Sequence, residues 1–106
     1  GREGLARLLS QSKAAPDAVF FSNDDMAVGG VFHCQTAGLA LPHDIALAGF
    51  NGLSIGQALP TPLTTIASNR EHIGYVAADH ILRRLKGEAP PRITQIDFRL
   101  VPGATA

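Results

Sequence analysis

The chain has 106 residues, and its nine basic and nine acidic side chains give a formal net charge of zero. A domain that holds DNA phosphates on its own is usually basic, so this balance argues against direct nucleic-acid binding. The single cysteine, Cys34, excludes an internal disulfide and a multi-cysteine zinc site, and its apolar neighbours favour a buried thiol. No stretch reaches the roughly 18 apolar residues that a membrane-spanning helix needs.

The first half of the chain predicts a helix, a strand and a second helix. Residues 2–12 place leucines at helical spacing, and a Pro-Asp pair then interrupts the chain. The short apolar run 18–22 is typical of a buried strand. Asn23 and Asp24 suit the start of the next helix, which we expect to end at Gly38. Because the sequence opens within its first helix, we expect the chain to start inside a domain.

The second half continues the alternation of strands and helices. The longest apolar periodicity predicts a helix at 69–86, with a glycine stop after it. The other predicted segments are a buried strand at 45–50, a glycine- and proline-rich loop at 51–63, an extended piece at 63–67 and an alternating last strand at 93–101.

This alternation defines the expected fold class as α/β, with a parallel sheet covered by helices on both faces. In such sheets ligands bind at the carboxyl ends of the strands. Two loops occupy such positions, S-N-D-D at 22–25 and F-N-G-L-S at 50–54. The sequence therefore predicts that a ligand site, if the domain has one, involves these two loops.

The second loop also contains a motif found in serine hydrolases. Residues 52–56, G-L-S-I-G, match the nucleophile elbow G-x-S-x-G, with Ser54 as the candidate nucleophile. The elbow needs a helix directly after the serine, whereas two prolines follow Ser54 within eight residues. The downstream acids and histidines fall in one predicted helix instead of on separate loops. A glycine-rich loop is the favoured interpretation, and a hydrolase remains the minor alternative.

Three motifs in this order are specific to one family. The first predicted strand ends in Asn-Asp, residues 41–50 read L-P-H-D-I-A-L-A-G-F, and residues 62–66 read P-L-T-T-I. With these motifs, residues 16–52 and 59–88 resemble the C-terminal part of the LacI/GalR family of sugar-responsive transcription repressors. Among the subgroups, the chain is most similar to the gluconate-type repressors.

The resemblance implies a periplasmic-binding-protein-like fold, in which two α/β subdomains are hinged around a small effector. A DNA-binding helix-turn-helix headpiece precedes that fold in the family. We expect residues 1–106 to be a fragment, the C-terminal part of the effector-binding domain, without the N-terminal subdomain or the headpiece. Effector binding in the whole protein would change the hinge and thereby the affinity for DNA.

The resemblance places three candidate effector contacts at the two strand ends, namely Asn23, Asp24 and Asn51. A carboxylate such as Asp24 accepts hydrogen bonds from several sugar hydroxyls, and the alternative is a simple helix cap. Asn51 stands where many relatives have an aspartate, and it is followed by Gly52 where they often have Asp or Asn. The alternative for Asn51 is a turn residue with an unusual backbone conformation.

Two further candidate contacts, Ser68 and Arg70, follow the P-L-T-T-I motif, which lies by the cleft in the family. Several relatives carry an aromatic residue at the position of Arg70. The guanidinium of Arg70 would instead bind a carboxylate in bidentate fashion, which fits a sugar acid such as gluconate. The alternative is a solvated arginine in the first turn of a helix, where the helix dipole disfavours positive charge.

Apolar residues near these loops are candidates for a homodimer interface, because the family dimerises largely through this subdomain. We select Val28, Val31, Leu53 and Ile55 as an apolar two-fold patch. The alternative for the two valines is ordinary core packing. On this interpretation Ser54 is a loop or interface residue.

The combined prediction is the effector-binding and dimerisation portion of a cytoplasmic LacI/GalR-type regulator, without catalysis or a cofactor. Its partners would be a sugar or sugar-acid effector and a second copy, with operator DNA bound only through the absent headpiece. The histidines have no metal-ligand spacing, so no metal site is expected. The alternative within the same fold is a sugar-binding protein of a transport system.

Overall fold

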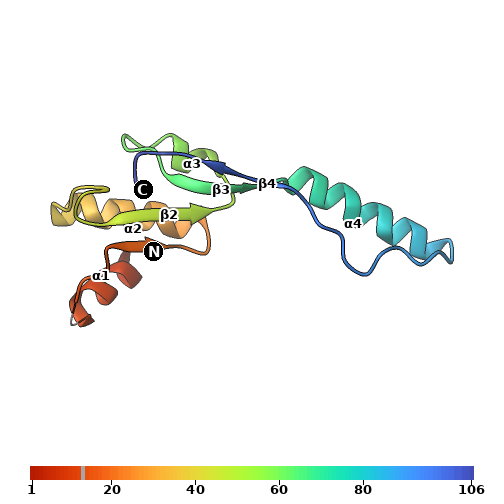
Figure 1. The fold of residues 1–106 in the computed structure, drawn as a ribbon, viewed down its shortest axis with the longest axis horizontal. Helices are drawn as coiled ribbons and strands as arrows, with labels where there is room; N and C mark the ends of the chain where they lie inside the picture. Colours follow the sequence, from red (N-terminus) through yellow and green to blue (C-terminus); the bar gives the residue numbers. More distant parts are fainter. Residues whose placement is uncertain (13) are drawn as a thin grey trace. The chain divides into compact units, whose positions relative to one another are not determined.

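The computed structural model describes residues 1–12 and 14–106. They form two compact units, one of Gly1–Ala67 with Arg99–Ala106 and one of Ser68–Phe98, and each is treated by itself. The elements are α1 (Arg2–Gln11), β1 (Ala18–Phe20), α2 (Asp24–Ala37), β2 (Ala46–Phe50), α3 (Ser54–Gln57), β3 (Thr64–Ser68), α4 (Arg70–Leu85) and β4 (Phe98–Val101) (Figure 1). This order confirms the predicted α/β class.

Two segments differ from the prediction. The expected loop 51–63 contains the four-residue helix α3, and the expected strand 93–101 begins only at Phe98, with no regular structure at 93–97. The short helix forms because Leu59 and Leu63 bury their side chains on either side of the proline pair, which draws the loop back onto the domain. Alternation of apolar residues alone does not make a strand, since a strand also needs a neighbour for its backbone hydrogen bonds.

The four strands form one sheet in the order β1-β2-β3-β4. β2 pairs in parallel with β1 and with β3, which confirms the predicted parallel arrangement. The register aligns Phe20 with Ala48, and Phe50 with Ile66. The carboxyl ends of β1 and β2 therefore lie at the same edge, where the loops of the predicted site begin.

The two faces of this sheet differ in burial. One face packs against α2, and it buries Leu47 and Thr65 almost completely. On the other face Phe20 is 62% exposed and Phe50 37% exposed. Within the first unit, α1 and α3 both pack on α2. The expected helix cover of the second face stays a prediction.

The core of the first unit lies between α1, α2 and the covered face of the sheet. Asn23 begins α2 by accepting a hydrogen bond from the Met26 amide at 2.8 Å, and Gly38 ends it with a φ of 71°. The buried apolar residues are Leu5, Phe21, Ala27, Val28, Val31, Cys34, Ile45, Leu47, Leu59 and Leu63. The prediction of a buried Cys34 is confirmed.

The final residues of the chain close the amino ends of β2 and β3. Thr105 is fully buried, and its hydroxyl donates to the Leu47 carbonyl at 2.7 Å and accepts from the Thr64 amide at 3.0 Å. The Leu47 amide in turn donates to the Thr105 carbonyl at 2.7 Å. These bonds satisfy backbone groups that the parallel strand pair leaves open at that end.

The second unit consists of α4 and the irregular segment after it. Asn69 caps α4 by accepting from the His72 amide, and Arg83 pairs with Glu88 at 2.8 Å beyond the helix end. In α4, all of whose residues are described, none is buried, so the predicted apolar face is present but exposed. Among the described helices, none has the length and apolar character to cross a membrane.

Burial of Cys34 predicts a pH dependence of stability. Desolvation raises the pKa of the Cys34 thiol above its ordinary value of 9.0. As the pH rises past 9, the unfolded chain loses this proton first, so the free energy of unfolding should fall. Urea unfolding of the wild type and of Cys34→Ala between pH 7 and pH 10 measures this. The wild type should lose more stability over that range, and equal losses would contradict the prediction.

Candidate functional site

The first candidate residues stand where β1 passes into α2. The Asn23 side-chain oxygen accepts from the Met26 amide, so Asn23 has the capping role that was its alternative interpretation. An asparagine also carries an NH2 group, and the cap uses only the oxygen. Asn23 is half-buried at the carboxyl end of β1, which is the position expected for a ligand contact.

Asp24 is fully buried, and both of its carboxylate oxygens are bound within the protein. Oδ1 accepts from the Thr65 hydroxyl on β3 at 2.6 Å, and Oδ2 accepts from the Leu53 amide at 2.6 Å. As the first residue of α2, the carboxylate also lies at the positive end of the helix dipole. The geometry gives Asp24 a structural role that neither of the two sequence interpretations contained.

The loop after β2 has an unusual backbone. Asn51 has a φ of 112°, which few non-glycine residues adopt, and its amide donates to the Ile66 carbonyl at 2.8 Å. Gly52 follows with a φ of 67°, and a Cβ there would collide with Ala67. This close approach explains why glycine follows Asn51 in this chain. Residues held in such conformations cluster at binding sites.

Ser68 and Arg70 flank the start of α4. Ser68 is the last residue of β3 and is half-buried, and Arg70 is the first residue of α4 and is exposed. Asn69 between them is the helix cap. The guanidinium of Arg70 is therefore accessible to an anionic group.

The four candidate interface residues separate into two pairs. Val28 is 7% exposed and Val31 is fully buried in the core, so their selection as surface interface residues is wrong and the core alternative holds. Both belong to the buried apolar core, which the sequence periodicity could not tell from an exposed side of α2. Leu53 is half-buried and Ile55 is 49% exposed, so these two remain available to a partner.

Ser54, the candidate nucleophile, is the first residue of α3. Its side chain is exposed, and α3 ends three residues later. Within residues 1–12 and 14–106, no hydrogen bond joins the Ser54 hydroxyl to a histidine. The same described residues contain no group of three potential metal ligands.

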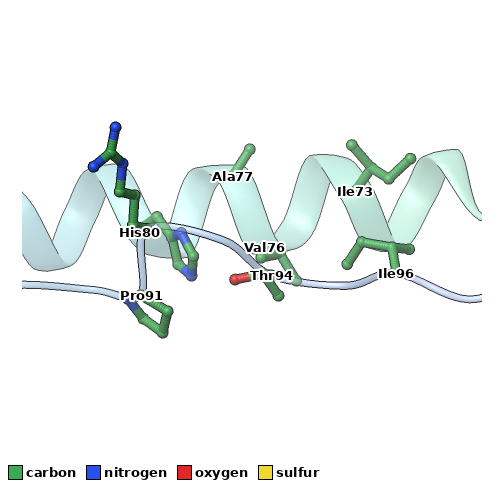
Figure 2. Close-up of a pocket in the computed structure, with 8 residues that line it drawn as sticks. Ile73, Val76, Ala77, His80, Pro91, Thr94 and Ile96 are labelled. Atoms are coloured by element: carbon green, nitrogen blue, oxygen red, sulfur yellow. The ribbon is translucent and has the colours of Figure 1, made fainter.

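Two of the grooves in the described residues are lined by none of the predicted effector contacts. In the second unit, α4 and the following segment border a groove of about 210 Å³, lined by Ile73, Val76, Ala77, His80, Pro91, Arg92, Thr94 and Ile96 (Figure 2). In the first unit a largely apolar groove of about 420 Å³ lies between α1, α2 and the turn before β2.

Sequence reasoning missed Thr65, the partner of Asp24. The signal was the Thr-Thr pair in P-L-T-T-I, because successive strand residues face opposite sides and one threonine of the pair must then face the core. A buried hydroxyl needs a hydrogen-bond partner, so a search for one would have led to an acid at a strand end. Within the described residues, every buried side-chain nitrogen and oxygen has such a partner.

Comparison with known proteins now identifies the family. A family model for a periplasmic binding protein-like domain matches residues 2–106. The lactose operon repressor of Rhizobium radiobacter is 42% identical over 82 residues, which cover 77% of this chain and 73% of that protein. The chain belongs to the LacI/GalR family. The family resemblance and the periplasmic-binding-protein-like fold are thus confirmed.

Two other LacI/GalR proteins are similar over most of the chain. The HTH-type transcriptional regulator GntR of Escherichia coli is 42% identical over 90 residues, which are 84% of this chain and 27% of that protein. The crystal structure of the transcription regulator GntR from Chromobacterium violaceum superimposes with a TM-score of 0.86 at 37% identity, covering 98% of this chain and 38% of that one. The chain thus spans between about a quarter and two fifths of these regulators.

Gly49→Ala tests how much the buried position of the Asp24 carboxylate contributes to the stability of this LacI/GalR domain. A Cβ at Gly49 would fall on Oδ1 of Asp24, so alanine must displace the carboxylate or the strand. We expect a loss of about 2 kcal/mol in the free energy of unfolding. The matched control is Gly4→Ala on α1, where a Cβ meets no atom and alanine favours the helix. Equal denaturation midpoints for the two variants would contradict the prediction.

Proposed function

We propose that this chain is the effector-binding and dimerisation portion of a LacI/GalR-type transcription regulator. The observation that carries the proposal is the match over residues 2–106, together with 42% identity to two proteins named as a repressor and a regulator. Residues 1–106 would be the C-terminal part of the effector-binding domain. Operator DNA would be bound through a headpiece outside these residues, which agrees with the zero net charge.

The proposed effector site uses the carboxyl ends of the parallel strands. Asn23 and Asn51 follow β1 and β2 and carry amides that both donate and accept, as sugar hydroxyls require. The φ of 112° at Asn51 supports this role, since strained residues persist where a function selects them. Ser68 would contribute a hydroxyl from the end of β3. Asp24 is not among the proposed contacts, because both oxygens are bound within the protein.

The proposed effector is a sugar acid, with gluconate as the first candidate. Its support is Arg70, whose exposed guanidinium opens α4 where the helix dipole disfavours a cation. A bound carboxylate would compensate for that position and would take up both arms of the guanidinium.

The proposal assigns no catalytic step and places the protein in the cytoplasm, where a DNA-binding regulator acts. Ser54 opens the helix α3, which has only four residues, and the described residues show no hydrogen bond from Ser54 to a histidine, which supports a non-catalytic residue. The relatives reported above are named as regulators, which favours this function over sugar transport.

The effector proposal predicts a selective effect of Arg70→Ala. Calorimetric titration of the full-length regulator with gluconate and with glucose should give binding of gluconate only. Arg70→Ala should weaken gluconate binding by about tenfold or more, because a charge-assisted bidentate contact is lost. The control is Arg84→Ala, an exposed arginine in the last turn of the same helix. Unchanged gluconate affinity in Arg70→Ala would return Arg70 to the solvated surface.

We also propose that the regulator forms a homodimer through the surface that contains Leu53 and Ile55. Ile55 is a large apolar side chain at 49% exposure, next to the half-buried Leu53 at the start of α3. Apolar residues in the centre of a two-fold interface meet their own copies and lose their contact with water.

The dimer proposal predicts that Ile55→Glu dissociates the regulator. Two copies of the new carboxylate would face each other in an apolar contact, which costs several kcal/mol. Sedimentation velocity at micromolar concentration should show a monomer for Ile55→Glu and a dimer for the wild type. Gln35→Glu adds the same charge at an exposed position late in α2 and should remain a dimer. A dimeric Ile55→Glu variant would exclude this surface.

A further inference from the structure

The loop after β2 is held by three consecutive backbone amides. The Asn51 amide donates to the Ile66 carbonyl at 2.8 Å, and the Leu53 amide donates to Oδ2 of Asp24 at 2.6 Å. Between them, the Gly52 amide donates to the Thr65 hydroxyl at 3.4 Å. Two of these three bonds therefore depend on the pair formed by Asp24 and Thr65.

The hydrogen bonds around the Asp24–Thr65 pair all have their donors directed toward the Asp24 carboxylate. Gly52 donates to the Thr65 hydroxyl, which donates onward to Oδ1 of Asp24 at 2.6 Å, while Leu53 donates to Oδ2. Because every bond points toward Asp24, both of its oxygens must act as acceptors. A carboxylate meets this requirement, whereas an asparagine side chain would turn an NH2 group toward a donor.

The carboxylate has little freedom to move from this position. Asp24 is fully buried, and a Cβ on Gly49 would collide with Oδ1. On the other side of the loop, the same construction at Gly52 would collide with Ala67. Asp24 thus joins the start of α2, the loop after β2 and strand β3 at one fixed spacing.

We propose that Asp24 is the positioning residue of the effector site, which orients Asn51 by holding Gly52 and Leu53 through Thr65 and its own carboxylate. The φ of 112° at Asn51 is then maintained by the two amides that follow it. This inference rests on the proposed function in one respect, the role of Asn51 as an effector contact. It differs from direct contact between Asp24 and the effector, since Asp24 acts through the backbone of its neighbours.

The test compares Asp24→Asn with Asp25→Asn in the full-length regulator. Asp25 is the next residue of α2 and is exposed, so the control removes the same charge from the same helix turn. Two readouts are taken below the unfolding transition: the Kd for gluconate or glucose, whichever the wild type binds, and amide hydrogen exchange of peptides covering 51–57. Thr65→Val and Thr65→Ser test the same path from the other partner, should Asp24→Asn fail to fold.

Positioning predicts a specific pattern in these readouts. Asp24→Asn and Thr65→Val should each raise the Kd about tenfold and speed exchange at 51–57, while Asp25→Asn and Thr65→Ser should stay close to wild type. In an Asn51→Ala background, Asp24→Asn should change the Kd by less than about twofold, because the loop then has no contact left to orient. A purely structural Asp24 would lower the unfolding temperature and leave the Kd unchanged.

The outcomes separate this inference from the proposed function. Kd losses that multiply in the Asp24→Asn, Asn51→Ala double variant would overturn positioning in favour of direct contact. An unchanged Kd in Asp24→Asn, with a weakened Asn51→Ala, would overturn positioning alone. If the wild type binds neither gluconate nor glucose, or if Asn51→Ala leaves the Kd unchanged, the proposed site fails. The claim that Asp24 orients an effector contact fails with it. Unchanged amide hydrogen exchange at 51–57 in Asp24→Asn would show that Asp24 does not hold the loop after β2, and would overturn the inference.

Discussion

The buried carboxylate of Asp24 is the constraint on which the carboxyl-end edge of the sheet depends. A fully buried charged group is stable only where hydrogen bonds and local dipoles replace its water. Here the Thr65 hydroxyl, the Leu53 amide and the start of α2 supply that replacement. The compensation binds three elements that are distant in sequence, so the carboxylate sets the spacing of the strand ends.

The two ends of the β2–β3 pair are closed by the same kind of interaction. At the carboxyl end, Thr65 and Asp24 hold the loop, and at the amino end the buried Thr105 bridges Leu47 and Thr64. Both closures satisfy backbone groups with side-chain oxygens inside the protein, where each unsatisfied group would cost free energy. Between them the apolar face of the sheet packs on α2, so the strands are fixed along their whole length.

Two neighbouring residues at the end of β1 have different structural roles. Asn23 and Asp24 are adjacent, yet one is half-buried at the sheet edge and the other lies in the interior. The helix start turns the second residue inward, and the first remains at the surface as a cap. The pair thus combines a polar group at the surface with an internal support for the adjacent loop.

Local patterns in the sequence predicted the family, the α/β class, the caps at Asn23 and Gly38, and the starts of α1, β1, α2, β2, β3 and α4 to within a residue. These features depend on short-range rules of periodicity and capping, which a single chain displays directly. Sequence reasoning left Val28 and Val31 between an interface and the core, left Asp24 between two roles and did not identify Thr65. Only the tertiary structure decided these points, because burial and hydrogen-bond partners such as Thr65 depend on contacts between residues far apart in the chain.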